Sequence, residues 1–102
     1  MVRDRAYLDW LRTQRCVVTG RRGHPAVETV DPAHMGTAGK GFKSSDDEAL
    51  PILHGIHETM HRRGEMTVLR EILPDDVLRD ALRAYAREMY RRWKHGDQNH
   101  PR

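Results

Sequence analysis

Residues 30–61 read VDPAHMGTAGKGFKSSDDEALPILHGIHETMH, and this stretch decides the fold. At its start the alternating residues 26–31 predict a short strand, and residues 50–53 form a second short apolar run that can pair with it. Pro51 has no amide hydrogen, so the second run fits only the edge of the pair. A polar loop joins the two runs and a helical segment follows. The stretch therefore predicts a short antiparallel hairpin followed by a helix, within an α+β fold.

The segment after the second run has histidines at helical spacing. We expect a helix over residues 54–63, which Gly64 is placed to end. His57 and His61 lie four residues apart in it, so their rings share one face of the helix about one turn apart. Two imidazoles in this arrangement can chelate a divalent metal. Surface histidines on an exposed helix are the simpler alternative.

Glu58 follows His57 directly, so the same segment satisfies the H-E-x-x-H pattern of zinc proteases. That pattern is short and recurs by chance, and these proteases need a third ligand further along the chain. Only His95 and His100 follow, in a tail that we expect to be disordered. A zinc protease is therefore the least favoured of the metal-dependent activities.

The flanking segments predict helices that brace this unit. Residues 3–14 have helical apolar spacing with Asp4 as a candidate N-cap. Residues 66–73 have a helical period, and residues 74–93 form the longest predicted helix, with one apolar stripe and most arginines off it. The short apolar run 16–20 ends in glycine, which indicates a strand or a turn.

The chain length fits a single domain, residues 1–102. We expect a core at about 15–64, a helical extension at about 65–94 and a disordered tail at 95–102. Hydrophobic residues make up 37% of the chain, below the usual share of about 45–50%. A metal, a partner subunit or long amphipathic helices must therefore supplement a thin core.

Charge is nearly balanced overall, with 18 Lys and Arg against 15 Asp and Glu. The excess of positive charge lies at the end of the chain, where residues 79–102 hold seven basic and three acidic side chains. A basic segment of this kind is compatible with a nucleic-acid partner. A solvated helix face is the plain alternative.

No run approaches the roughly 18 apolar residues of a membrane span. The N-terminal MVRDRAYLDW is charged and lacks the apolar region of a signal peptide. Cys16 is the only cysteine, so no intrachain disulfide can form, which favours a reducing compartment. We therefore expect a cytoplasmic protein with no membrane partner.

Four pieces in order carry a family resemblance: Ala-His at 33–34, G-F-K-S-S-D at 41–46, P-I-L at 51–53 and I-H-E-T-M-H at 56–61. With this spacing the chain resembles the HNH (His-Me finger) family of ββα-metal nucleases, in the phage and prophage branch that includes recombination-enhancement proteins. The resemblance implies a small ββα-metal core flanked by an N-terminal helix and C-terminal helices. It also implies a metal-dependent endonuclease that nicks or cuts DNA in a bacterial host cell.

The resemblance assigns roles to the histidines. His34 is the expected general base, because imidazole changes protonation near neutral pH. His57 and His61 are the expected metal ligands, and His34, Asp31 and Asp46 remain candidates for the third. Mg²⁺ or Mn²⁺ is expected for activity, and Zn²⁺ can occupy such a site. Asp46 is expected to orient a histidine, pair with a lysine or cap a loop.

The expected nucleic-acid contacts are basic side chains on the loop, after the metal helix and on the last helix. Solubility is the alternative explanation for the charges on the loop. A favourable interaction with the helix dipole is the alternative explanation for those at the helix end. Such contacts fix position rather than sequence, so little base specificity is expected. The residues are Lys40, Lys43, Arg62, Arg63, Arg83, Arg87 and Arg91.

Two departures from the family pattern have consequences. Many relatives hold a structural zinc at positions that match Cys16, Thr19, Leu53 and Ile56, and three of these four side chains bind zinc poorly. We expect an apolar cluster in place of that zinc, so no structural zinc knuckle is predicted. Ala33 stands where many relatives have a metal-binding Asp or His. This favours, as the alternative, a catalytically inactive HNH-fold module that binds nucleic acid.

The family also has an asparagine that this chain replaces with Glu48 or a neighbouring residue. DNA is the expected partner. A second copy of the chain, in a homodimer, and a phage recombination or packaging protein are further candidate partners.

Overall fold

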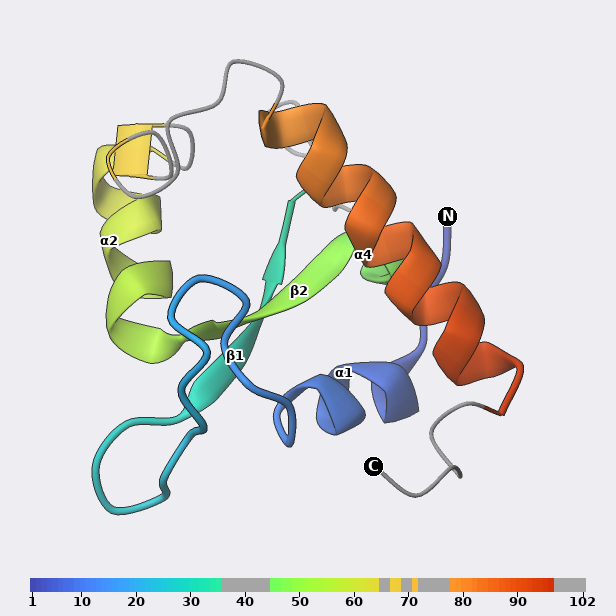
Figure 1. Ribbon diagram of the computed structural model, residues 1–102, viewed down its shortest axis with the longest axis horizontal. Coiled ribbons are helices and arrows are strands. Elements are labelled where there is room, and N and C mark those ends of the chain that lie inside the picture. The colour runs from blue at the N-terminus through green and yellow to red at the C-terminus, as the bar shows by residue number, and fades with distance from the viewer. Residues whose placement is uncertain (36–44, 65–66, 69–70, 72–77, 97–102) are drawn as a thin grey trace.

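The computed structural model describes residues 1–35, 45–64, 67–68, 71 and 78–96, with only the backbone at 78–80. These residues form an α+β fold built from a two-stranded antiparallel sheet and helices (Figure 1). In chain order the elements are α1 (Arg5–Leu11), β1 (Val30–His34), the 3₁₀ helix η1 (Asp46–Glu48), β2 (Ala49–Leu53), α2 (His54–Arg63) and α4 (Leu78–Lys94). No helix in these parts of the chain is long and apolar enough to cross a membrane.

The predicted hairpin and the helix after it are confirmed. β1 pairs with β2 in antiparallel register from Val30–Leu53 to His34–Ala49. β1 starts later than the predicted strand at 26–31, because the chain first makes a tight turn closed by a bridge between His24 and Glu28. The first strand of the hairpin therefore begins later than predicted and ends at His34.

α2 follows β2 without a linker and ends where the sequence predicts. The amide of Gly64 donates to the carbonyl of Met60, and Gly64 has a φ of 96°, which glycine adopts without a steric cost. This fixes the length of the helix that carries His57 and His61.

The main core lies where α2 and the β1–β2 hairpin meet. Every residue of β2 is buried. Cys16 is 1% exposed and belongs to the same cluster as Leu53, and Ile56 packs against that cluster. The apolar cluster expected at these positions is therefore present. The run 16–20 is a turn rather than a strand, closed by a 2.7 Å hydrogen bond from the Gly20 amide to the Cys16 carbonyl.

A second cluster joins the two ends of the described chain. Asp4 caps α1 as predicted, since its side chain accepts a hydrogen bond from the Tyr7 amide. Tyr7 is fully buried and packs edge-on against Tyr90, with ring centroids 4.7 Å apart, and against Trp93 at 5.3 Å. Figure 1 shows the C-terminal part of α4 lying beside α1. Of the described side chains in the apolar stripe of the last helix, Leu82, Met89 and Trp93 are partly buried against the two clusters, whereas Ala81 and Tyr85 are exposed.

Polar contacts add to this packing. Glu48 of η1 accepts hydrogen bonds from Arg83 and Arg87 of α4. These bonds hold η1, and therefore the start of β2, against the long helix.

Several predictions lie wholly or partly outside the described residues. They are Lys40, Lys43, most of the helix at 66–73, the start of the long helix at Pro74 and the tail from residue 97.

Candidate active site

His34 and Asp46 form a hydrogen-bonded pair between the hairpin and η1. His34 is the last residue of β1, and its Nε2 lies 2.8 Å from Oδ1 of Asp46, the first residue of η1. Asp46 thus bonds a histidine, while Lys43, its other candidate partner, lies outside the described residues. An ionised carboxylate can only accept, so Nε2 carries a hydrogen, and in the neutral ring Nδ1 is the nitrogen with the lone pair.

Asp46 is itself held from several sides. Its Oδ2 accepts a 2.8 Å hydrogen bond from the Asp4 amide, and Arg3 lies 3.4 Å from Oδ1. Burial opposes ionisation, but the hydrogen bonds from His34 and the Asp4 amide, together with nearby positive charge, outweigh it and hold the pKa of Asp46 below its ordinary value. Asp46 is 5% exposed, so this carboxylate is a rigid acceptor for His34.

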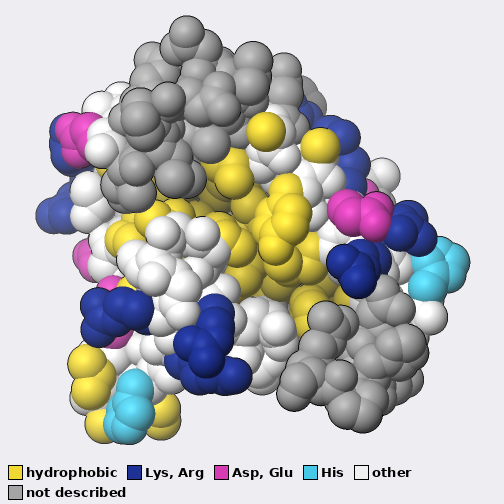
Figure 2. Space-filling view, in the orientation of Figure 1, with side chains coloured by type: hydrophobic (Ala, Val, Ile, Leu, Met, Phe, Trp, Pro, Cys, Tyr) yellow, Lys and Arg dark blue, Asp and Glu magenta, His cyan; other side chains and the backbone are white. Residues whose placement is uncertain are grey.

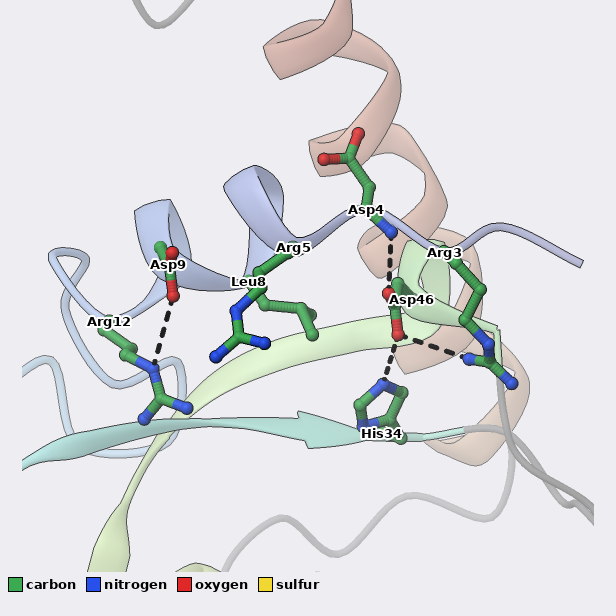
Figure 3. Close-up of a pocket in the computed structure, with 8 residues that line it drawn as sticks. All are labelled: Arg3, Asp4, Arg5, Leu8, Asp9, Arg12, His34 and Asp46. Carbon is green, nitrogen blue, oxygen red and sulfur yellow. Dashed lines mark hydrogen bonds and ion pairs between the residues drawn. The ribbon is translucent and has the colours of Figure 1, made fainter.

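A pocket of about 670 Å³ opens beside this pair. Figure 3 shows His34 and Asp46 at one side of the view and the side chains of the α1 segment at the other. The lining also includes three arginines that the sequence did not mark as functional: Arg3, Arg5 and Arg12. His34 therefore lies at an open recess lined by three arginines and three aspartates rather than in a closed core.

His57 and His61 form a second polar cluster, on α2. Their Nε2 atoms lie 3.0 Å apart, with ring centroids 4.6 Å apart. On the other side of the His57 ring, Nδ1 lies 3.1 Å from Oδ2 of Asp31. A carboxylate on Nδ1 favours the tautomer whose Nε2 can bind a metal, as in the carboxylate–histidine pairs of metal sites. The two Nε2 atoms thus suit a shared divalent cation.

Asp31 also holds a third histidine. Nδ1 of His54 lies 2.7 Å from the same Oδ2 atom, and the exposed His54 ring also faces Glu58 at 3.5 Å. Partial burial opposes ionisation of Asp31, but the hydrogen bonds from His54 and His57 hold its pKa below the ordinary value. The same hydrogen bond raises the pKa of His54. Asp31 therefore organises the N-terminal end of α2.

The third metal ligand is not identified among the described residues. In that part of the chain, no group of three or more His, Cys, Asp or Glu side chains is arranged to hold a metal ion. His34 and Asp46 bond to each other, and Asp31 bonds to the ring nitrogen of His57 that faces away from His61. Asp31 and His34 are three residues apart on β1, about 10 Å along the strand.

The three predicted DNA-binding arginines of α4 each pair with an acidic side chain. Arg83 and Arg87 pair with Glu48, and Arg91 pairs with Glu88. On the face of the molecule that Figure 2 shows, Lys and Arg side chains lie around the rim and hydrophobic side chains lie at the centre.

Arg62 and Arg63, the last two residues of α2, are exposed. Arg63 pairs with Glu71, and Arg62 donates to the Thr59 hydroxyl. Both side chains lie at the surface at the C-terminal end of α2.

Sequence reasoning left two features unassigned. The first is the role of Asp31 toward His54 and His57, for which the only signal was its place three residues before His34. The second is the lining contributed by Arg5 and Arg12 of the α1 segment, to which the sequence analysis assigns no role.

Comparison of the chain with protein-family models, curated proteins and solved structures found no match.

Proposed function

We propose that this protein is a metal-dependent endonuclease of the HNH type, which hydrolyses phosphodiester bonds in DNA with His34 as general base. The observation that carries the proposal is the His34–Asp46 pair at the open recess. A general base needs a free lone pair, an orienting partner and access to substrate, and this arrangement supplies all three.

The roles assigned to the two residues of the His34–Asp46 pair follow from its geometry. Nδ1 of His34 accepts the proton of the attacking water, because Nε2 is occupied by Asp46. Asp46 keeps the ring in this tautomer and stabilises the imidazolium that forms when Nδ1 takes the proton. Asp46 is thus a positioning residue, and His34 is the residue that touches the reacting water.

The histidine pair on α2 fits a divalent metal by its donor chemistry. His57 and His61 would hold Mg²⁺ or Mn²⁺ through their Nε2 atoms, and Asp31 would orient His57. When bound, such a cation supplies stabilisation of the charge that develops on the phosphate and the leaving oxygen. The antiparallel hairpin followed directly by α2 is the part of the fold on which this assignment rests.

Plasmid nicking tests this function. Supercoiled DNA is incubated with the protein in Mg²⁺, Mn²⁺, Zn²⁺ or EDTA, beside the His34→Ala variant and a His95→Ala control. His95 is exposed and lies after α4, outside the recess. Metal-dependent nicking that survives His95→Ala and is lost in His34→Ala supports the proposal. Absence of nicking with every metal contradicts it.

One observation favours the second candidate, an inactive nucleic-acid-binding module with this fold. Ala33 is 1% exposed and belongs to the main apolar cluster, so the position before His34 has no ligand to offer. Intact DNA binding without nicking would support this candidate.

A further inference from the structure

We infer that Arg5 and Arg12 of the α1 segment form a phosphate-binding wall that holds the nucleic-acid backbone opposite His34. The inference rests on the proposed function and deepens it, because it assigns the direction from which the substrate strand approaches the base. It adds two residues to the expected nucleic-acid contacts.

Both side chains come from one face of one segment. Arg5 is the first residue of α1 and Arg12 its C-cap, seven positions apart, which is about two turns and about 10 Å of helix. Leu8 lies between them on the same face and also lines the pocket, while Tyr7 and Leu11 point into the core. Figure 3 shows both guanidinium groups directed from α1 toward β1, the strand that ends in His34.

The wall keeps its positive charge available. Arg5 makes no ion pair within the described part of the chain in this structure. Arg12 lies 4.0 Å from Asp9, with both side chains more than half exposed, and such a pair contributes little and exchanges readily for a phosphate. Both groups can therefore face an incoming anion.

The remaining acidic side chains of the recess are mostly engaged elsewhere. Asp46 is bonded to His34 and the Asp4 amide. Asp4 caps α1 and accepts from the Tyr90 hydroxyl, and Figure 3 shows its carboxylate directed away from His34. Only Asp9 offsets the two arginines on their own face.

The ligand class follows from the donors and their neighbour. Guanidinium groups present planar pairs of donors that match two phosphate oxygens. Two such groups two turns apart, beside a histidine whose Nδ1 has no partner among the described residues, suit the phosphates of one strand better than a single small anion. The phosphodiester backbone is the ligand that brings a scissile bond to His34.

The experiment measures the binding of the protein to a 20-base-pair DNA duplex by fluorescence anisotropy over a series of salt concentrations. Removing two phosphate contacts should make the slope of log K against log salt shallower by about 1.8. We expect this change in Arg5→Gln/Arg12→Gln, together with weaker binding at low salt. Arg5→Lys/Arg12→Lys keeps the charge and should keep most of the slope.

The matched control is Arg21→Gln/Arg22→Gln, which removes two charges from a turn outside the recess. It should leave the slope close to that of the parent. The wall is contradicted if the α1 variant keeps the parent slope, or if both variants lower it equally. Circular dichroism verifies the fold, which both changes should preserve because both side chains of α1 are exposed.

Two further results distinguish a failure of this inference from a failure of the proposed function. Inorganic phosphate at constant ionic strength should not displace the duplex, and displacement that depends on Arg5 and Arg12 would indicate a free-phosphate site and overturn the inference. Nicking by the parent with an unchanged slope in the α1 variant overturns the wall alone. A slope change confined to the α1 variant, without nicking by the parent, overturns the endonuclease and leaves the wall in place.

Discussion

Nε2 of His34 lies 2.8 Å from Oδ1 of Asp46, across a hairpin connection of which residues 36–44 lie outside the described part of the chain. The pair joins the last residue of β1 to the first residue of η1. The N-terminal segment fixes it further, through the Asp4 amide on Asp46. A histidine held in one tautomer at an open recess is therefore a feature of the whole fold, not of one loop.

Exchange of the orienting carboxylate tests this relationship. In Asp46→Asn the amide can still accept from the Asp4 amide, but it no longer favours a hydrogen on Nε2 or stabilises the imidazolium. We expect the nicking rate to fall by about 10- to 100-fold while DNA affinity is kept. The pH–rate profile should also change shape, which a purely structural role of Asp46 would not produce. An unchanged profile and rate would contradict the assigned role.

The histidine pair on α2 predicts a measurable metal affinity. His57→Ala and His61→Ala should each abolish Mn²⁺ binding in isothermal titration calorimetry, because each removes one of the two Nε2 donors. Asp31→Asn should weaken binding by about 10- to 100-fold through the orientation of His57. His54→Ala is the matched control, since His54 bonds the same carboxylate without facing the pair. Equal losses in all four variants would mean that the cluster is structural.

The bridge between η1 and α4 predicts a stability that depends on pH. Burial opposes ionisation of Glu48, but its bonds to Arg87 and Arg83 hold its pKa below the ordinary 4.5. A lowered folded-state pKa means that the stabilisation is fully present above about pH 4.5 and is lost as the pH falls through the folded value. We expect Glu48→Gln to cost about 1–3 kcal/mol at pH 7 and to flatten the acid limb of the unfolding curve. Parallel curves for the two proteins would refute this.

The aromatic cluster gives a prediction of the opposite sign. The hydroxyl of Tyr7 is buried without a hydrogen-bond partner among the described residues, and burial raises the pKa of Tyr7. Tyr7→Phe should therefore raise the free energy of unfolding by about 1 kcal/mol, or roughly 4–8 °C in Tm.

The matched change is Tyr90→Phe, which removes a 3.0 Å hydrogen bond to Asp4 and should lower stability by about 1 kcal/mol. Thermal unfolding of both variants distinguishes the two hydroxyls. A loss of stability in both would mean that the Tyr7 hydroxyl has a partner.

Local patterns predicted the helices and the hairpin because their signals are short in range. The Asp4 cap, the Gly64 end and the His57–His61 spacing each depend on residues within one or two turns. β1 was placed too early because the bridge between His24 and Glu28 forms a turn where alternation alone indicates a strand.

The rest of the candidate site could not be predicted because it depends on contacts between distant segments. Arg5 and Arg12 line the same recess as His34, because α1 packs against the hairpin and, through Tyr7, against Trp93 of α4. Arg83 and Arg87 carry the sequence signal of a DNA-binding face, yet both pair with Glu48 more than thirty residues away. Charge patterns alone do not distinguish a basic side chain that is free for a ligand from one that holds the fold.

The most direct test of the central claim is the metal-dependent nicking of supercoiled plasmid by the parent and His34→Ala at equal protein concentration, with DNA affinity measured in parallel. His34 supplies the proton acceptor in this account. It predicts nicking by the parent in Mg²⁺ or Mn²⁺, a loss of about 100-fold or more in the variant, and equal affinity for DNA in both. Nicking at the parent rate by His34→Ala, or no nicking by the parent with any metal, would contradict it.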